Sequence, residues 1–446
     1  MPSAFVLGLA AVTSIVAARG LSITTCLALM LSGCGRAGTA PTQLLDSIQT
    51  PDGTGGFNHP QIVDRDYVVL ISFDGLRHDY LDRVDTPGFD RLAATGAIAD
   101  ALIPVFPSLT FPSHYSIATG MYPANHGIVG NQFYDPARDD AFNYRDTDDA
   151  QDGSWWDGEP IWLTAERQGM AAATLFFPGT EAIIDGLRPS HWRTYDESLP
   201  NRARIEQVLQ WLRLPPDERP HLITTYFSMV DSAGHTLGPD SPELERSLRT
   251  ADGLLNELLS EIEGLPYGDR VYVVAVSDHG MGAVDPDRQV LVRNAVDLRG
   301  IRAVPLGPAL SLHVDGDDAR SVEIRDTFNR RVDERDARAF LRDESPPHLQ
   351  MASSARYGDV VLLPAEDVLI VFRRNPSPPA GMHGWDPALP SMHGVFLVRG
   401  PEIDGGQEIP AFEVIHIYPF LAEILGLTPN PAIDGTLEVL EPILVP

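Results

Sequence analysis

Residues 68–75 read Val-Val-Leu-Ile-Ser-Phe-Asp-Gly, and this stretch decides the fold class. Its first six positions are mostly apolar and β-branched and have the length of a strand, and Asp74-Gly75 begins a turn. A strand that is apolar on successive residues is buried on both faces, as in a parallel sheet covered by helices. The stretch therefore predicts the first strand of an α/β fold, with the folded region beginning at residue 66.

The same alternation of strands and helices continues along the chain. Strand-like runs occur at 172–177, 222–229, 271–276 and 394–398. Helical patterns occur at 160–168, 202–213, 243–262 and 417–425. This order predicts an α/β fold with a mostly parallel central sheet flanked by helices on both faces. The stretch 293–370 breaks the rhythm and is predicted to be a small inserted subdomain.

The composition is that of a globular protein with a strong acidic bias. Of the 446 residues 43% are hydrophobic, and 62 acidic against 33 basic residues give a formal net charge of −29. Every basic residue is an arginine. A field of this sign repels polyanions, so we expect no nucleic-acid scaffold role. A small anionic substrate has to be attracted locally, and bound metal ions can do this.

The N-terminal segment has the features of an export signal. Arg19 precedes an apolar run at 21–31, which is too short for a comfortable membrane span and ends in Leu31-Ser32-Gly33-Cys34. That tetrapeptide resembles a bacterial lipobox. It predicts a lipoprotein-type signal peptide at 1–33 and a lipid anchor on Cys34. An ordinary signal peptide or an uncleaved anchor is the alternative.

The rest of the chain divides into two predicted parts. Residues 34–65 are rich in Gly, Pro, Thr and Ser and are expected to form a flexible tether, followed by a catalytic domain at 66–446. We expect the protein at a membrane of the bacterial cell envelope, facing the periplasm. The only cysteines are Cys26 and Cys34, so a metal site in the folded domain must use Asp, Glu and His.

Aspartate and histidine residues follow several predicted strands. Asp74 ends the first strand, and the run 222–230 is followed by Asp231 and, four residues later, His235. Because ligands bind at the carboxyl edge of open α/β sheets, these side chains are expected to converge. Six of them can hold two divalent metals with open positions, as a catalytic zinc site requires, although manganese or iron would also fit. The six are Asp74, Asp231, His235, Asp278, His279 and His383.

Thr110 is the predicted nucleophile. Residues 106–115, Phe-Pro-Ser-Leu-Thr-Phe-Pro-Ser-His-Tyr, leave a strand-like segment and enter a helical one that ends at Gly120. Thr110 then lies at the helix N-terminus, where backbone N–H groups and the dipole favour a phosphate. Coordination to a metal activates a hydroxyl without a nearby base. Thr110 can also serve as the helix N-cap, and the two roles are compatible.

Several short motifs occur in order from about residue 66 to the C-terminus. They are Phe73-Asp74-Gly75, the stretch 106–115, Asn125-His126-Gly127-Ile128-Val129-Gly130-Asn131, Phe177-Pro178-Gly179-Thr180-Glu181, Asp231-Ser232-Ala233-Gly234-His235, Ser277-Asp278-His279-Gly280-Met281 and His383-Gly384-Trp385-Asp386. Together they resemble the nucleotide pyrophosphatase/phosphodiesterase family of the alkaline phosphatase superfamily. The resemblance implies an alkaline phosphatase-like fold and two Zn²⁺ ions per chain. It assigns one ion to Asp231, His235 and His383, and the other to Asp74, Asp278, His279 and the Thr110 oxygen.

The resemblance also implies roles for residues that bind the substrate. Asn131 would donate its side-chain amide to a phosphoryl oxygen and stabilise the charge that develops there. Phe111 and Tyr226 match positions that sandwich the base in nucleotide-cleaving members. Stacking on both faces of a base tolerates different bases.

The implied activity is hydrolysis of phosphodiester or pyrophosphate bonds in nucleotides, releasing nucleoside monophosphates through a phosphothreonyl intermediate. The sequence departs from the family next to the substrate region, because Ser228-Met229-Val230 stands where many members have Glu-Glu-Pro, and Trp385 and Pro387 replace Tyr and Asn. A phosphodiesterase for lipid head groups such as phosphocholine or glycerophosphodiesters is therefore the alternative enzyme. A lipid-anchored binding protein with a vestigial site is the alternative outside enzymes.

Overall fold

The computed structural model describes residues 56–314 and 317–445. The predicted signal peptide at 1–33 and the anchor at Cys34 lie outside the described residues, as does most of the predicted tether. The end of that tether is packed against the domain: Asn58 is buried, and its Nδ2 donates to the Arg219 carbonyl oxygen at 2.8 Å. Within the two described ranges, no helix combines the length and the apolar content needed to cross a bilayer.

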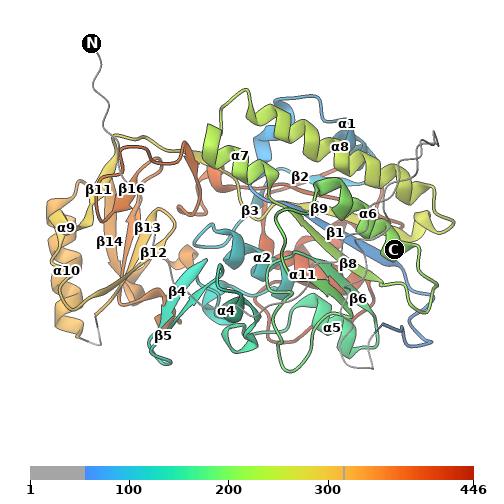
Figure 1. Ribbon diagram of the computed structural model, residues 1–446, viewed down its shortest axis with the longest axis horizontal. Helices are drawn as coiled ribbons and strands as arrows, with labels where there is room; N and C mark the ends of the chain where they lie inside the picture. The colour runs from blue at the N-terminus through green and yellow to red at the C-terminus, as the bar shows by residue number, and fades with distance from the viewer. Residues whose placement is uncertain (1–55, 315–316, 446) are drawn as a thin grey trace, which may run out of the picture. The chain divides into compact units, whose positions relative to one another are not determined.

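An eight-stranded mixed sheet forms the centre of the domain (Figure 1). Its strands are β1 (Tyr67–Phe73), β2 (Ala97–Ala99), β6 (Ala172–Leu175), β7 (His191–Arg193), β8 (Leu222–Phe227), β9 (Val271–Val276), β18 (Phe396–Arg399) and β19 (Gln407–Ile409). They lie in the order β19-β2-β18-β9-β1-β8-β6-β7. The strands from β9 to β7 run parallel to one another, and β18 is antiparallel to both of its neighbours. The predicted α/β class with a mostly parallel sheet is confirmed.

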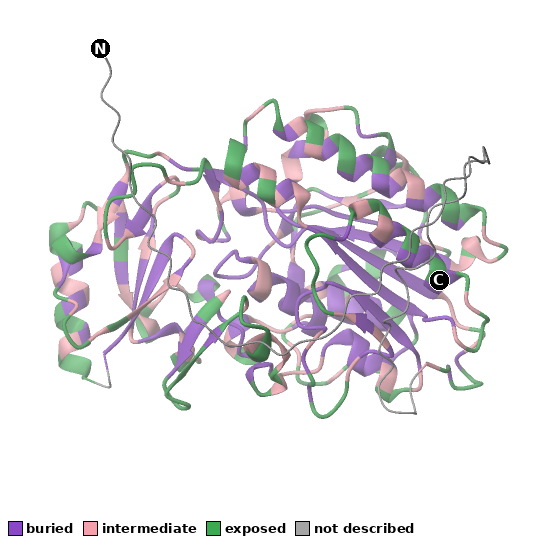
Figure 2. Ribbon diagram, in the orientation of Figure 1, coloured by how far each residue is buried: buried purple, intermediate pink, exposed green. Residues whose placement is uncertain are grey.

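Helices cover both faces of this sheet, and β1 shows why. Val68 and Leu70 point into one hydrophobic core, while Val69 and Ile71 point into the other. The strand is buried along its whole length, as Figure 2 shows for the neighbouring strands too. The first core is shared with α2 (Thr110–Thr119), α5 (Ile161–Arg167) and α11 (Ile417–Ile424). The second is shared with α1 (Pro87–Ala94), α6 (Asn201–Leu212), α7 (Met229–Leu237) and α8 (Leu244–Glu263).

The longest helix, α8, illustrates how the sequence forms these covering helices. Apolar side chains recur every three or four residues, which gathers them on one face of the helix. That face is buried, whereas most of the charged residues between them are exposed or partly exposed; Asp252 is the exception, buried where it accepts from Gly88 N and Phe89 N. Each fully buried leucine contributes roughly 2 kcal/mol of transfer free energy. The buried apolar residues of this helix include Leu248, Ala251, Leu255, Leu258, Leu259 and Ile262.

The segment 293–370 holds a second sheet with a core of its own. Its four antiparallel strands lie in the order β12-β13-β15-β14 and are covered by a helix. The elements are β12 (Arg302–Leu306), β13 (Ala309–His313), β14 (Ala337–Leu341), β15 (Val360–Pro364) and α10 (Asp318–Arg331). Leu312, Phe328 and Val360 meet in its core. We call this segment the insert.

Short paired strands connect these larger parts. The pairs are the hairpin of β4 (Gln132–Asp135) and β5 (Asp140–Asn143), β3 (Leu102–Ile103) with β20 (Phe412–Glu413), β10 (Gly282–Ala283) with β17 (Gly381–Met382), and β11 (Gln289–Leu291) with β16 (Leu369–Val371). The remaining helices are α3 (Pro123–His126), α4 (Thr147–Gln151) and α9 (Val292–Ala295). The pair β10–β17 matters for the site, because β10 follows the end of β9 and β17 directly precedes His383.

Candidate metal centre and active site

Three neighbouring parallel strands bring acidic residues to one edge of the central sheet. Asp74 directly follows β1, and Asp278 lies two residues beyond the end of β9. Asp231 lies in the first turn of α7, which begins just after β8. His383 reaches the same edge because β17 pairs with β10. The strand order thus gathers residues that are far apart in the sequence.

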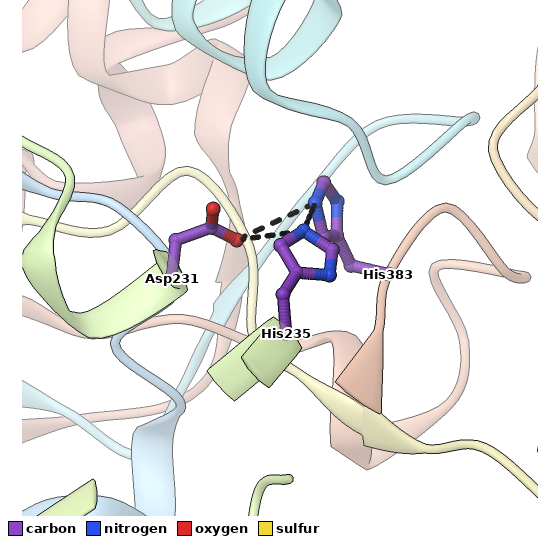
Figure 3. Close-up of side chains that lie close together, drawn as sticks. All are labelled: Asp231, His235 and His383. Carbon is purple, nitrogen blue, oxygen red and sulfur yellow. Dashed lines mark hydrogen bonds and ion pairs between the residues drawn. The ribbon is translucent and has the colours of Figure 1, made fainter. Parts of the chain in front are cut away.

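One cluster consists of Asp231, His235 and His383 (Figure 3). Asp231 Oδ1 lies 3.4 Å from His235 Nε2 and 3.5 Å from His383 Nε2, and the two imidazole nitrogens are 3.2 Å apart. The opposite ring nitrogens donate to carbonyl oxygens: His235 Nδ1 to Gly381 and His383 Nδ1 to Ser108, both at 2.8 Å. Those hydrogen bonds leave each Nε2 unprotonated and pointing at the shared space, as a metal ligand requires.

The second cluster consists of Asp74, Asp278 and His279. His279 Nε2 lies 3.4 Å from Asp74 Oδ1 and 3.1 Å from Asp278 Oδ2. His279 Nδ1 donates to the Gly280 carbonyl oxygen at 2.8 Å, so its Nε2 is the nitrogen available for a metal. All three side chains are buried. In each cluster the candidate ligand atoms lie within 4.8 Å of one another.

The electrostatics of these side chains suit bound cations. Burial raises the pKa of Asp74 well above its usual value, and the charges of Asp278 and Asp231 raise this pKa further. Burial lowers the pKa of His383 to about 3, and His235 adds to the effect. A cation favours ionised carboxylate and neutral imidazole, and so offsets the cost of burying both. Among the described residues, Asp74 Oδ1, Asp231 Oδ1 and Asp278 Oδ2 are buried without a hydrogen-bond partner, and coordination would satisfy them.

Thr110 and Asn131 lie next to the second cluster. Thr110 begins α2, and its Oγ1 lies 3.4 Å from His279 Nε2. Phe111 N donates to Asn131 Oδ1 at 3.0 Å, which fixes the Asn131 carboxamide beside the helix N-terminus. The Asn131 Nδ2 group therefore remains to donate into the pocket that both residues line. The Thr110 hydroxyl and the Asn131 amide group thus line the same pocket as the carboxylates of Asp74 and Asp231.

A pocket of about 540 Å³ opens onto these residues. Asp74, Thr110 and Asp231 line it, together with seven aromatic residues. This volume suits a ligand of nucleotide size, since small-molecule pockets typically enclose about 300–1,000 Å³. The aromatic rings around it are Phe111, Tyr144, Trp156, Phe176, Phe177, Tyr195 and Tyr226.

The family model for type I phosphodiesterases and nucleotide pyrophosphatases matches residues 68–386, a range that contains both clusters. The chain belongs to this family. It is 33% identical over 402 residues to an uncharacterised pyrophosphatase/phosphodiesterase of Schizosaccharomyces pombe, covering 87% of this chain and 82% of the yeast protein. It is also 33% identical over 398 residues to human ectonucleotide pyrophosphatase/phosphodiesterase family member 1, covering 86% of this chain. The chain spans only 42% of the length of this human protein.

Solved structures of the family agree with the fold of this phosphodiesterase-family chain. Murine ectonucleotide pyrophosphatase/phosphodiesterase 5, an inactive threonine-to-alanine variant in complex with AMP, superimposes with a TM-score of 0.80 at 26% identity, covering 85% of this chain and all of the murine one. The alkaline phosphatase-like fold is thereby confirmed. Family membership supports hydrolysis of phosphodiester or pyrophosphate bonds, and the two clusters are candidate metal sites of a metal-dependent family.

Tyr226 lines the pocket, as predicted, and also contacts the second cluster. Its hydroxyl donates to Asp74 Oδ2 at 2.5 Å, and only 8% of the residue is exposed. Asp74 thus has one oxygen held by Tyr226 and the other left for a metal. Tyr226 thus lines the pocket and also orients Asp74, and its role as a base-stacking ring stays a prediction.

Tyr195 is a pocket residue that the sequence did not single out. It follows β7, is 42% exposed, and lines the pocket that Phe111 also lines. Its backbone N–H donates to Glu181 Oε1 at 2.7 Å, and Glu181 also accepts from Gln151 Nε2 at 3.1 Å. Side-chain contacts between loops set this position, and no periodic pattern in the sequence reports such contacts.

His114 was also missed, although its spacing carries a signal. It lies four residues after Thr110 on α2, so the two residues share one face of the helix. His114 Nδ1 donates to the Thr110 carbonyl oxygen at 2.8 Å and lies 3.2 Å from Asp278 Oδ2, while Nε2 contacts Ser72 Oγ at 2.7 Å. Burial lowers the pKa of His114 to about 4, so the ring is neutral. It ties α2 to the second cluster.

Proposed function

We propose that the chain hydrolyses phosphodiester or pyrophosphate bonds in nucleotides and releases nucleoside monophosphates, using Thr110 as nucleophile and two zinc ions. Asp231, His235 and His383 would hold one ion, and Asp74, Asp278 and His279 the other. Zinc bound there supplies positive charge that lowers the pKa of a coordinated hydroxyl and stabilises phosphoryl oxygens. The observation that carries the proposal is the position of Thr110 Oγ1, 3.4 Å from His279 Nε2, at the floor of an aromatic pocket.

The residues of this chain divide the reaction into two displacements at phosphorus. Thr110 Oγ1 loses its proton and attacks, forming an Oγ1–P bond while the bond to the leaving alcohol or phosphate breaks. A water molecule then forms the new P–O bond, Oγ1 leaves, and the nucleoside monophosphate is released. In both steps Asn131 Nδ2 donates to a non-bridging oxygen, where negative charge increases. The N-terminus of α2 favours the same charge.

The aromatic residues that line the pocket support a nucleotide as the substrate. Phe111 and Tyr195 are the aromatic pair that we assign to the base, because Phe111 follows the nucleophile and Tyr195 is the more exposed of the two candidate tyrosines. Stacking between rings depends little on the identity of the base, so the enzyme should accept several bases. The AMP bound to the murine relative supports a nucleotide ligand.

A comparison of three esters tests the proposal. The full-length chain, purified in detergent and supplied with zinc, is assayed on a nitrophenyl nucleoside monophosphate diester, nitrophenyl phosphate and nitrophenyl phosphocholine. We expect the nucleotide diester to be cleaved fastest and Thr110→Ala to abolish its cleavage. Activity that survives in Thr110→Ala would refute the nucleophile. No activity above the variant on any ester would favour a binding protein with a vestigial site.

A lipid head-group phosphodiesterase is the second candidate, and the same pocket favours it in one respect. Aromatic rings together with the carboxylates of Glu181 and Glu197 could surround a quaternary ammonium such as choline. Arg145 lines the pocket as well and would repel that cation. Faster cleavage of nitrophenyl phosphocholine than of the nucleotide diester would establish this second function.

We further propose that the enzyme is a lipoprotein of the bacterial cell envelope that faces the periplasm. The support is Leu31-Ser32-Gly33-Cys34, preceded by a short basic and apolar segment. Expression in a bacterial host with a labelled fatty acid should label the protein, and Cys34→Ala should abolish the label. Labelling of Cys34→Ala to the level of the unmodified chain would refute the anchor.

A further inference from the structure

The hairpin β4–β5 carries part of the active site but is not paired with the central sheet. Among the described residues its two strands hydrogen-bond in a sheet only with each other. Asn131 immediately precedes β4, and its carbonyl oxygen accepts from Tyr144 N, just after β5, at 3.0 Å. The base of the hairpin thus supplies the proposed phosphoryl donor and one ring of the pocket wall. A two-stranded hairpin is marginally stable in isolation, so other contacts must fix it.

The insert supplies these contacts, chiefly through Arg356. Arg356 Nε donates to Asp135 Oδ2 at 2.9 Å, and Nη1 donates to the carbonyl oxygens of Gly127 at 2.8 Å and Trp155 at 3.1 Å. The guanidinium also lies 5.3 Å from the centroid of the Phe133 ring. The side chains of Arg356 and Asp135 are only 13% and 9% exposed, so solvent and salt screen this ion pair little.

The residues that Arg356 contacts lie on both sides of Asn131 in the sequence. Gly127 lies four residues before it and Asp135 four residues after it, and one guanidinium binds both. Gly127 adopts a positive φ of 85°, and a Cβ there would lie 2.3 Å from Arg356 Nη1. Only a glycine lets the guanidinium reach this carbonyl oxygen.

Further contacts from the insert reinforce the same region. The Arg302 guanidinium of β12 lies 3.9 Å from the centroid of the Tyr134 ring in β4, and Figure 1 shows the hairpin beside β12. Tyr357, next to Arg356, donates its hydroxyl to the Phe106 carbonyl oxygen at 2.6 Å, four residues before the nucleophile. The insert therefore touches both the hairpin and the loop that leads to Thr110.

We propose that Arg356 is a positioning residue, through which the insert holds Asn131 at the distance from Thr110 that charge stabilisation requires. The proposal rests on the proposed function, because it takes Asn131 to be the group that stabilises charge in that active site. Removing the guanidinium takes the donor away from Asp135 Oδ2 and from the Trp155 carbonyl oxygen, and the hairpin shifts or loosens to hydrate them. A shift of about 1 Å in a catalytic group can cost on the order of 100-fold in rate.

A double-mutant cycle with zinc analysis tests the proposal in the full-length holoenzyme. Arg356→Ala should lower kcat by about 10- to 100-fold, the cost of a displaced catalytic group, with zinc content unchanged. In an Asn131→Ala background the same change should cost less than about 3-fold, because residues that act through one another are not additive. Arg338→Ala is the matched control: Arg338 is an exposed arginine of β14 in the sheet of the insert. It should leave kcat unchanged.

Hydrogen exchange gives a readout that does not depend on activity. In Arg356→Ala, amide exchange should accelerate in peptides covering 127–145 and stay unchanged in peptides with Asp74 or Asp278. Arg356→Lys keeps a charge but cannot reach all three acceptors, so it should show intermediate kcat and exchange, and it replaces the alanine variant if that does not fold.

The possible failures can be told apart. Equal losses of kcat from Arg356→Ala in both backgrounds, loss of zinc, or unchanged exchange at 127–145 would overturn the positioning role while leaving the phosphodiesterase proposal intact. Full activity in Thr110→Ala would overturn the proposed function instead. Full activity in Asn131→Ala would overturn both the amide donor and the role of Arg356.

Discussion

The two sides of the active site are built in different ways. Five of the six candidate metal ligands lie just after strands of the central sheet or on the helix α7 that follows β8, whereas His383 follows β17; four of the six are buried. The pocket wall is formed by a hairpin and by loops, with residues such as Tyr144 and Tyr195 that remain partly exposed. The first side is held by the backbone pairing of parallel strands, the second by side-chain contacts such as those of Glu181 and Arg356. The candidate metal ligands are therefore positioned mainly by strand pairing, whereas the pocket wall depends on side-chain contacts between loops.

The largest effect is expected at the junction of the two sides. Thr110→Ala removes the attacking oxygen and should lower kcat on the order of 10⁶-fold, as loss of a nucleophile does elsewhere. Zinc content, measured by elemental analysis, should not change, because the six Asp and His ligands remain. Thr110→Ser is the control and should keep measurable activity, since it retains a hydroxyl. Equal activity of the alanine and serine variants would contradict the assignment.

On the metal side, Tyr226→Phe should weaken metal retention. The variant keeps the ring but removes the hydrogen bond to Asp74 Oδ2. Loss of such a contact to a ligand typically costs about 10- to 100-fold in metal affinity. Chelator competition measures the affinity, and activity at saturating zinc should recover. If zinc affinity equals that of the unmodified chain, Tyr226 does not orient Asp74.

On the pocket side, Tyr195→Ala should weaken nucleotide binding and leave the metals in place. Stacking of a base on a ring contributes about 1–3 kcal/mol, so kcat/KM for the nucleotide diester should fall about tenfold. Tyr195→Phe keeps the ring and should match the unmodified enzyme. Tyr195→Ala should change substrate affinity alone, and Tyr226→Phe should change metal affinity alone. The two variants therefore separate the two sides of the active site. A Tyr195→Ala enzyme with normal kcat/KM would place the base elsewhere.

The smallest effect concerns pH, at a histidine outside the ligand set. Burial lowers the pKa of His126 from 6.5 to about 3, and its Nδ1 accepts from Ile128 N at 3.2 Å. As pH falls, His126 therefore binds a proton at a higher pH in the unfolded chain than in the folded chain. The stability that the neutral ring provides is complete above pH 6.5 and declines between 6.5 and about 3.

Chemical denaturation of the metal-free chain between pH 7.5 and 5 measures this decline. The slope from His126 should be small at pH 7.5 and approach about 1.4 kcal/mol per pH unit near pH 5. His126→Gln does not titrate in this range and should flatten the slope by that amount. An unaltered slope in the variant would show that other groups cause the decline.

The sheet side of the molecule could be predicted because its signals are local. The runs around Val68, Leu222 and Val271 are apolar on successive residues, and each became a parallel strand of the central sheet. Asp and His at their ends converge because parallel strands end at one edge. The direction of β18 could not be predicted in this way. The run at 394–398 predicts a strand, but its antiparallel direction depends on how the chain returns from the insert.

The sequence by itself determined the α/β class, the convergence of six candidate metal ligands and the place of Thr110 at a helix N-terminus, because strand periodicity and position after a strand are encoded locally. Only the tertiary structure decided that Tyr226 binds Asp74, that Tyr195 faces the pocket, and that Arg356 of the insert holds the Asn131 hairpin. Those contacts join residues whose separation in sequence bears no relation to a helix or strand period. Their positions follow from how loops pack together, and no single segment carries that information.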